Sequence, residues 1–434
     1  MSKYVIIGNS AAGIGAVEGI RQTDRDGEFT VITDEPHHTY SRPLISYLLL
    51  GKVTEEGMKY RDGGFYSDNN CALLQNARAA EVDAVTKNVV LHDGGRIPYG
   101  KLLVATGSSP FVPPFEGLDT VREKHTFMSL DDARKLDAAL DQNKRVLIAG
   151  AGLIGLKCAE GIHRRVKHVT VLDLAPGILS SILDEEGARL VQNHLENAGI
   201  EFRLAASIKR FENNSAVLEG GGTADFDILV LAVGVRPNTA LLNGVAKIDR
   251  GIVVNEKSET TARDIYAAGD CTQALDVSSG QSKIMAILPN AYMQGECAGI
   301  NMAGGGDNGG ARFDKAIPMN AIGFLGLHII TAGSYSGDVY AEGAGGAGAE
   351  AGGASGAGGA SGAGGGNYKR LFYSNNNLNG YILIGNVEKA GIYTSLIRER
   401  VPLDTIDFAL VCEKPGLMAF TKEDRMAKLG GSSS

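Results

Sequence analysis

Six residues have the glycine spacing of a phosphate-binding turn: Gly150-Ala151-Gly152-Leu153-Ile154-Gly155. They follow an apolar strand pattern, Arg145–Ala149, and open a helix pattern, Leu153–Arg165. The first glycine allows a tight turn, the second lets a pyrophosphate approach the backbone, and the third lets helix and strand pack closely. The next strand pattern, Val169–Asp173, ends in a carboxylate that can accept both hydroxyls of an adenosine ribose. The sequence therefore predicts a dinucleotide-binding turn here, with a glycine-rich packing turn as the alternative.

A second unit of the same kind lies at the start of the chain, Gly8-Asn9-Ser10-Ala11-Ala12-Gly13. A strand pattern, Tyr4–Ile7, precedes it, and a helix pattern, Ala11–Gln22, leads to the strand pattern Phe29–Thr33. Ser10 replaces the middle glycine, and serine is small enough for close phosphate approach. Thr33 occupies the place equivalent to Asp173, and two acids follow it, Asp34 and Glu35. These residues predict a second nucleotide site, with ordinary helix packing as the alternative.

Three further segments end apolar strand patterns in small or acidic residues. Leu102–Val104 runs into Ala105-Thr106-Gly107, and Leu229–Leu231 runs into Ala232-Val233-Gly234, followed by Val235-Arg236-Pro237-Asn238. Four residues separate Thr260 from the segment Ile265-Tyr266-Ala267-Ala268-Gly269-Asp270. Asp270 can hydrogen-bond a ribityl chain, and its alternative is a helix N-cap or turn aspartate.

Taken in this order, the motifs resemble those of the FAD-dependent pyridine nucleotide–disulfide oxidoreductase superfamily, over roughly residues 1–310. Coenzyme A disulfide reductases, NADH oxidases and NADH peroxidases of this superfamily carry one reactive cysteine in the segment equivalent to Pro36–Gly51, and glutathione-reductase-like members carry a pair; this chain has none there. Its Tyr40-Ser41-Arg42-Pro43-Leu44-Ile45-Ser46 instead resembles NADH–rubredoxin and ferredoxin reductases and the flavin part of NADH-dependent nitrite reductases. Residues 316–330 and 380–400 are similar to the C-terminal domain of that subgroup, which usually helps to form a dimer.

The resemblance implies roles for individual residues. For FAD it implies that the turn of Gly8, Ser10, Ala11, Ala12 and Gly13 binds the pyrophosphate and that Glu35, or alternatively Asp34, binds the adenosine ribose. Arg42 and Pro43 would contact the flavin, Ala80 would contact the adenine, and Ala105, Thr106 and Gly107 would line the cofactor. Asp270 would bind the ribityl chain, and Pro289, Asn290 and Ala291 would begin a helix that points at the flavin. For NADH it implies Gly150, Gly152, Leu153, Ile154, Gly155, Asp173, Ala232, Val233 and Gly234. The cofactors carry the chemistry, so no acid–base catalyst is expected.

Two positions depart from the pattern of these relatives. A lysine follows the serine in ferredoxin reductases, where this chain has Tyr47, and many relatives have glutamate at the position of Lys157. Lys157 is expected to be plain helix surface, with pairing to a partner or substrate anion left open. We expect His37-His38 to be a polar loop, the basic run Arg164–His168 to be a solvated helix end, and Cys271 to be a small buried residue.

Composition excludes several classes of protein. The chain has 434 residues and a formal net charge of −8, from 42 Lys+Arg and 50 Asp+Glu. This balance argues against a general nucleic-acid or anionic-membrane binder, and no apolar run is long enough to cross a membrane. The five cysteines are scattered singly, which excludes a paired-cysteine mechanism and a cysteine metal site within the chain. No signal-peptide pattern opens the chain, so we expect a cytoplasmic protein.

Two strand–helix–strand units predict an α/β fold with two doubly wound, Rossmann-like dinucleotide-binding domains plus a C-terminal α+β domain. We expect a split FAD-binding domain at 1–110 and 238–312, a NAD-binding domain at 111–237, a C-terminal dimerisation-type domain at 313–425 and a tail at 426–434. Residues 341–366 contain only Gly, Ala, Ser and Glu, which predicts a flexible loop joining the two strands of a hairpin. Whether this loop is natural or engineered is left open.

The predicted function is an NADH:acceptor oxidoreductase that passes electrons through FAD to rubredoxin, ferredoxin or an iron–sulfur subunit. Two alternatives stay open: an NADH oxidase that reduces O₂ or a small molecule directly, and a redox-sensing flavoprotein subunit with little turnover. We expect a homodimer. The sequence does not identify the acceptor, because electron-transfer docking is weak and leaves no motif.

Overall fold

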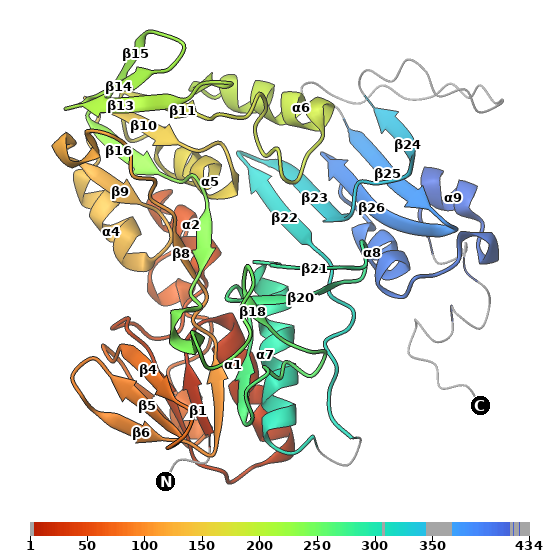
Figure 1. Ribbon diagram of the computed structural model, residues 1–434. Helices are drawn as coiled ribbons and strands as arrows, with labels where there is room; N and C mark the ends of the chain where they lie inside the picture. The colour runs from red at the N-terminus through yellow and green to blue at the C-terminus, as the bar shows by residue number, and fades with distance from the viewer. Residues whose placement is uncertain (1–3, 306–308, 344–366, 417–419, 421–424, 426–434) are drawn as a thin grey trace. The chain divides into compact units, whose positions relative to one another are not determined.

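The computed structural model describes residues 4–305, 309–343, 367–416, 420 and 425 (Figure 1). These residues form two compact units. The first comprises the described residues up to Ile178, together with Glu196–Asp276 and Gln281–Ala316; the second comprises Leu179–Leu195, Val277–Gly280 and the described residues from Ile317 onward. Within the described ranges, every helix is too short or too polar to cross a bilayer.

The first unit contains a five-stranded parallel sheet that carries the N-terminal glycine turn. Its strand order is β19-β7-β1-β2-β3, formed by Ile265–Ala267, Lys101–Val104, Tyr4–Ile7, Phe29–Ile32 and Cys71–Leu74. β1 and β2 are buried along their whole length, as expected for sequences in which Thr30 alone is polar. Helix α1 (Ala11–Thr23) connects them and packs on α7 (Leu288–Met302). Glycines allow this close crossing, since a Cβ at Gly295 would lie 2.0 Å from the Ala12 carbonyl oxygen.

A second five-stranded parallel sheet in the same unit carries the other glycine turn. Its order is β12-β11-β10-β16-β9, formed by Ile200–Arg203, His168–Leu172, Arg145–Ala149, Ile228–Leu231 and Lys124–Thr126. Helix α5 (Leu153–Ile162) follows β10, and α4 (Leu130–Ala139) follows β9. In each sheet the strand that precedes the glycine turn is central: β1 lies between β2 and β7, and β10 lies between β11 and β16, which is the doubly wound arrangement. The predicted fold class is confirmed. The helix pattern Leu153–Arg165 is too long by three residues, because the chain turns after Ile162.

Smaller elements surround the two parallel sheets. β8 (Ser108–Pro110) pairs antiparallel with β17 (Val235–Pro237), where the chain passes twice between the two doubly wound parts. The short helices α2 (Ile45–Leu49) and α3 (Phe65–Asp68) follow β2. Three three-stranded sheets complete the unit: β4-β5-β6 (Ala79–Asp83, Asn88–Leu91, Arg96–Pro98), β13-β14-β15 (Ile208–Glu212, Ser215–Leu218, Thr223–Asp225) and β18-β20-β21 (Ile252–Val253, Thr272–Asp276, Gln281–Lys283).

The second unit is built on an antiparallel sheet. Its order is β22-β23-β26-β25-β24, formed by Met319–Phe324, Leu327–Gly333, Asn377–Ile384, Tyr368–Ser374 and Asp338–Gly343. Buried residues of this sheet share an apolar core with α8 (Ala390–Arg398) and α9 (Phe408–Glu413). Most of α6 (Glu185–Glu196) also belongs to this unit. The α+β prediction for the C-terminal part is confirmed.

The long Gly/Ala/Ser segment differs in part from its prediction. β24 and β25 pair antiparallel, which confirms the predicted hairpin. The predicted loop 341–366 begins too early, because Ala341–Gly343 are the last residues of β24 and pair with Tyr368–Arg370. Backbone pairing there does not depend on side-chain type, so a composition argument placed the loop boundary wrongly. Residues 344–366 and the tail 426–434 lie outside the described residues.

Asp264, just before β19, joins the start of β7 to the turn between β4 and β5, and its loss should destabilise the protein. The Lys87 and Lys101 ammonium groups each lie 2.6 Å from its carboxylate, and these contacts lower the pKa of Asp264 to about 2. Asp264→Asn is expected to cost about 1–2 kcal/mol after screening by solvent. The pKa of Asp264 is lower in the folded protein than in the unfolded chain. The contribution of its ion pairs to the free energy of unfolding is therefore full above about pH 5 and is lost as the pH falls towards 2. Urea unfolding of both proteins at pH 7 and pH 3 checks this; a constant difference would contradict it.

Candidate cofactor-binding site

The two predicted glycine turns have the same geometry. Gly8 has φ +119° and Gly150 has φ +114°. A Cβ at Gly8 would lie 2.1 Å from the Ala105 carbonyl oxygen, and one at Gly150 would lie 2.2 Å from the Ala232 carbonyl oxygen. Each turn is therefore closed over by the small-residue turn that ends another strand of its own sheet. The predicted Ala105–Gly107 and Ala232–Gly234 motifs are equivalent parts of a structural repeat.

The third glycine of each motif is also required by packing. A Cβ at Gly13 would lie 2.0 Å from the Gly8 carbonyl oxygen, and one at Gly155 would lie 2.0 Å from the Gly150 carbonyl oxygen. The middle position differs, because a Cβ at Gly152 would meet no atom within 4 Å. A side chain is therefore tolerated at this position, which explains how Ser10 can replace glycine in the first motif.

The N-termini of α1 and α5 fit a pyrophosphate. Ser10 is the N-cap of α1, yet within the described part of the chain its side chain makes no capping hydrogen bond. Gly152, the N-cap of α5, has no side chain to offer. By contrast, Ser129 caps α4 by accepting a hydrogen bond of 3.0 Å from the Asp132 N–H. Backbone N–H groups in the first turn of a helix that no side chain caps can bind an anion. These groups belong to Ala11, Ala12 and Gly13 in α1 and to Leu153, Ile154 and Gly155 in α5.

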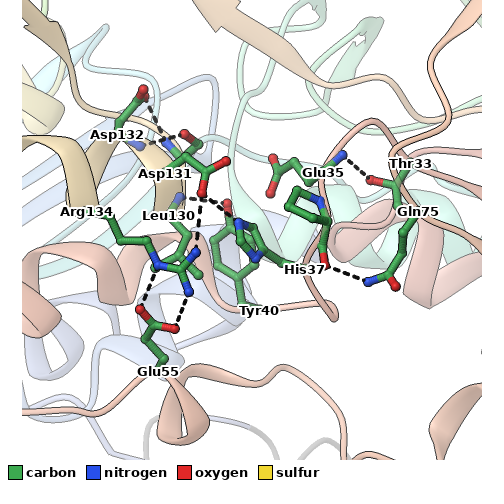
Figure 2. Close-up of polar contacts among 12 residues, drawn as sticks. Thr33, Glu35, His37, Tyr40, Glu55, Gln75, Leu130, Asp131, Asp132 and Arg134 are labelled. Carbon is green, nitrogen blue, oxygen red and sulfur yellow. Dashed lines mark hydrogen bonds and ion pairs between the residues drawn. The ribbon is translucent and has the colours of Figure 1, made fainter.

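A pocket opens beside the first turn. Glu35 lines it while Asp34 is exposed and does not, so the structure favours Glu35 as the ribose acid. The Glu35 N–H donates to Thr33 Oγ1 over 3.2 Å (Figure 2), and the Glu35 carboxylate is ion-paired with the Arg42 guanidinium. Pro43 is exposed, and Ala80 is an exposed residue of β4. The pocket is lined by Asn9, Ser10, Thr33, Glu35, His37, His38, Tyr40 and Arg42.

His37 and His38 were expected to form only a polar loop, and that prediction missed their place at the pocket. His37 Nε2 lies 2.8 Å from Asp131 Oδ1 of α4. The Tyr40 hydroxyl accepts a hydrogen bond of 3.0 Å from the Leu130 N–H at the start of the same helix (Figure 2). The segment after β2 is thus attached to α4. His37 and His38 lie between Glu35 and Arg42 in the sequence, and this position was the signal that could have placed both histidines at the pocket.

Asp270 fits a role as a hydrogen-bond acceptor. It lies in the turn between β19 and β20, so no helix follows it and the N-cap alternative is wrong. The Ser108 hydroxyl donates to Asp270 Oδ2 over 3.2 Å. Burial raises the pKa of Asp270, and the Ser108 hydrogen bond and the Arg42 charge oppose that rise. A carboxylate has about four acceptor positions, so one donor leaves capacity for ligand hydroxyls.

The turns next to Asp270 are also fixed by hydrogen bonds. Thr106 Oγ1 donates to the Asn238 carbonyl over 2.6 Å, and Asn238 Nδ2 donates back to the Thr106 carbonyl over 2.9 Å. The Gly269 N–H donates to Gln294 Oε1 of α7 over 2.8 Å. α7 begins at Leu288 with a proline in its first turn, so the helix start predicted at Pro289, Asn290 and Ala291 is confirmed.

Asp173 lies directly over the second glycine turn. Its Oδ2 accepts a hydrogen bond of 2.6 Å from the Ala151 N–H, and its Oδ1 accepts one of 2.7 Å from the Ala175 N–H. The basic run lies away from it. His168 begins β11 and its Nε2 lies 2.6 Å from Glu201, while Arg165 is ion-paired with Asp137. Asp173 follows the other end of β11, roughly 16 Å away for five extended residues.

Lys157 is not plain helix surface, and that prediction is wrong. Its side chain is only 15% exposed and is ion-paired with the buried Glu160. A pattern of charges along a helix does not reveal which face packs on a neighbour, and here that neighbour comes from a segment distant in sequence.

The cysteines are thiols without partners for disulfide formation. All five are free, and four are buried, including Cys271 as predicted. Burial raises the pKa of Cys271 and of Cys297 to about 11, so these thiols stay protonated and unreactive at neutral pH. The part of the chain that the structure describes contains no cluster of three or more His, Cys, Asp or Glu residues able to hold a metal ion.

Activity should therefore not depend on thiols. Replacing all five cysteines by Ser or Ala is expected to retain more than about half of NADH turnover with an artificial acceptor, because no thiolate is available as a nucleophile. Circular dichroism establishes that the variant is folded. Loss of more than about 90% of turnover in a folded variant would revive a thiol mechanism.

Comparison with known proteins is consistent with this geometry. The model of the pyridine nucleotide-disulphide oxidoreductase family matches residues 2–295. The epsilon subunit of NADH-dependent phenylglyoxylate dehydrogenase from Aromatoleum evansii is 35% identical over 338 residues, covering 77% of this chain and 79% of the relative. Rubredoxin-NAD(+) reductase from Pseudomonas putida is 30% identical over 310 residues, covering 69% and 80%.

Solved structures show the same fold. The crystal structure of the covalent putidaredoxin reductase–putidaredoxin complex matches with a TM-score of 0.83 at 20% identity, covering 99% of each chain. The family match spans both glycine turns and Asp270, which are the parts whose geometry fits nucleotide binding. The chain therefore belongs to the pyridine nucleotide-disulphide oxidoreductase family, and it is an oxidoreductase that uses FAD and NADH.

Proposed function

We propose that the chain oxidises NADH and delivers the electrons, through bound FAD, to a separate electron-acceptor protein. The observation that carries this proposal is the structural repeat: two glycine turns of equal geometry, Gly8–Gly13 and Gly150–Gly155, lie in one compact unit. Two nucleotide sites in one unit suit one resident and one exchanging cofactor. When bound, FAD accepts a hydride from NADH and can release the two electrons one at a time.

We assign the N-terminal turn to FAD and the second turn to NADH. The N-terminal turn lies beside the pocket lined by Glu35 and Arg42. It belongs to the same sheet as β19, the edge strand that leads to Asp270. In this assignment Glu35 binds the adenosine ribose of FAD, Asp270 binds the ribityl chain, and Asp173 binds the adenosine ribose of NADH. The remaining contacts are those predicted from the sequence, and the three-domain division belongs to the same proposal.

The acceptor is proposed to be rubredoxin, ferredoxin or an iron–sulfur subunit. Three observations support a protein acceptor over a thiol substrate. Of the two relatives described above, one is named for rubredoxin and the other is a subunit of a dehydrogenase. The matched crystal structure is a reductase in complex with putidaredoxin. The cysteines of this chain are single and mostly buried. A homodimer and a cytoplasmic location remain part of the proposal.

Anaerobic mixing with NADH tests the first half of this function, since bleaching of the flavin absorbance shows reduction. Turnover is then compared with O₂ alone, with rubredoxin and with ferredoxin. The proposal expects a carrier protein to raise turnover at least about tenfold over O₂, because carrier docking places the two redox centres close together. Equal rates with and without carriers would instead support the direct oxidase, and an unreduced flavin would support the low-turnover subunit.

A further inference from the structure

Tyr47 and Lys157 contact each other across two helices. Tyr47 lies on α2 and Lys157 lies on α5, and Lys157 Nζ lies 4.6 Å from the centre of the Tyr47 ring. Figure 1 shows α2 beside α5, and the two helices pack together. The contact therefore joins the segment that follows the proposed FAD pocket to the helix that begins at the proposed NADH turn.

The Lys157 ammonium is held on two sides. Its side chain is 15% exposed, and the Glu160 carboxylate, one turn along the same helix and 4% exposed, forms an ion pair with it. A cation removed from water needs such a counter-charge. The face of the Tyr47 ring supplies a second attraction, which grows as the cation is desolvated. Lys157 is thus fixed on α5 by Glu160 and reaches across to α2.

The two helices approach closely beside this contact. A Cβ at Gly161 of α5 would lie 3.2 Å from the Ser46 carbonyl oxygen and 3.3 Å from Leu49 Cβ, so a larger residue there would push α2 away. Arg165, just beyond α5, donates to the Leu49 carbonyl over 3.1 Å. α2 is therefore held at its middle by Lys157 and near its end by Gly161 and Arg165.

We propose that Lys157 is a positioning residue that, through Tyr47, fixes the spacing of α2 and α5 for hydride transfer between the two cofactors. The inference rests on the proposed function. Hydride transfer requires the reacting atoms to be held in near-contact geometry, and a displacement of about 1 Å can cost about 10²-fold in rate. Loosening this contact should therefore slow the reduction of bound flavin without preventing either nucleotide from binding.

The test compares Lys157→Met and Tyr47→Leu with the wild-type holoprotein. Each is expected to lower the limiting rate of flavin reduction by NADH about tenfold, equivalent to about 1.4 kcal/mol, in anaerobic stopped-flow measurements. The dissociation constants of FAD and NAD⁺, measured by calorimetry, should change less than about threefold. Independently of turnover, hydrogen exchange at the amides of residues 45–51 should become faster in both variants.

Matched controls separate positioning from general damage. Lys52→Met removes an exposed ammonium that lies 5.9 Å from the same Tyr47 ring, and Tyr47→Phe keeps the ring face; both should react like wild type. The double variant Lys157→Met/Tyr47→Leu should be no slower than Lys157→Met alone, because Lys157→Met already removes the contact with the Tyr47 ring. A Lys157→Met protein reduced within twofold of the wild-type rate would overturn this inference alone. A wild type that NADH does not reduce would overturn the proposed function and this inference together.

Discussion

NADH is expected to be used about 10²-fold more efficiently than NADPH, measured as kcat/KM, which corresponds to about 2.7 kcal/mol. Asp173 causes the preference, because its carboxylate is held over the second glycine turn by the Ala151 and Ala175 N–H groups. A 2′-phosphate would bring up to two negative charges against it. Like charges about 4 Å apart repel by roughly 4 kcal/mol at an effective dielectric of about 20. Solvent and side-chain rotation lower this value.

The surroundings of Asp173 supply no obvious compensation for a 2′-phosphate. The four residues that follow it, Leu174-Ala175-Pro176-Gly177, contain no lysine or arginine. The nearby Arg203 donates to Glu201 and to the Thr223 carbonyl, so it is already engaged. In the basic run that leads into β11, His168 is paired with Glu201 and Arg165 with Asp137.

Steady-state kinetics with both nucleotides test this prediction on wild type and on Asp173→Ser. The variant should lose most of the preference, chiefly by using NADH less well and NADPH no worse. Asp119→Ser, which removes an exposed carboxylate from the same unit, is the matched control and should leave the ratio unchanged. Equal use of the two nucleotides by wild type, or an unchanged ratio in Asp173→Ser, would show that another group selects the nucleotide.

Much of the fold could be predicted because local and long-range signals agree at the parallel strands. Tyr4–Ile7 and Val146–Ala149 are continuous apolar runs ended by glycine, and both lie in central strands of their sheets. Boundaries failed where backbone geometry rather than residue type decides them. Ala341–Gly343 continue β24 because their backbone groups find partners on β25. Before the loop, the chain turns at Gly333, where φ is +76°, and this turn separates β23 from β24.

In the candidate site, too, some residues could be predicted from the sequence and some contacts could not. Gly13 and Gly155 are excluded from carrying a side chain by residues close in sequence, the carbonyls of Gly8 and Gly150. Gly8 and Gly150 are closed by the distant Ala105 and Ala232 carbonyls, but the spacing of the glycine motif identifies them without knowledge of those contacts. The contact between Lys157 and Tyr47 could not be predicted from the sequence, because these residues are 110 positions apart and meet only where α2 packs on α5. The same holds for His37 and Asp131, which lie 94 positions apart. Sequence motifs identify the turns that bind, whereas packing between distant segments determines how the two nucleotide sites are held together.

Asp270→Ala is expected to raise the dissociation constant of FAD about 10- to 100-fold, because a charge-assisted hydrogen bond contributes about 1.5–3 kcal/mol. Asp270 is largely buried and keeps free acceptor capacity beside the Ser108 hydroxyl. Titration of the apoprotein with FAD, followed by flavin fluorescence, measures the effect. Asp264→Asn is the matched control, since it removes a carboxylate six residues earlier that is paired with two lysines.

The pH dependence of FAD binding separates this role from a merely structural one. Since burial raises the pKa of Asp270, its carboxylate becomes protonated at a higher pH than an ordinary aspartate when acid is added. A protonated carboxyl no longer attracts ligand hydroxyls as an anion, so wild-type affinity should fall with decreasing pH while Asp270→Ala, already weak, should change much less. Ser108→Ala should bind FAD with affinity between the two, because the carboxylate remains but loses the donor that helps to hold it. If Asp270→Ala binds FAD as tightly as wild type at neutral pH, the aspartate shapes only the turn between β19 and β20, and the flavin ribityl chain must be bound by other groups.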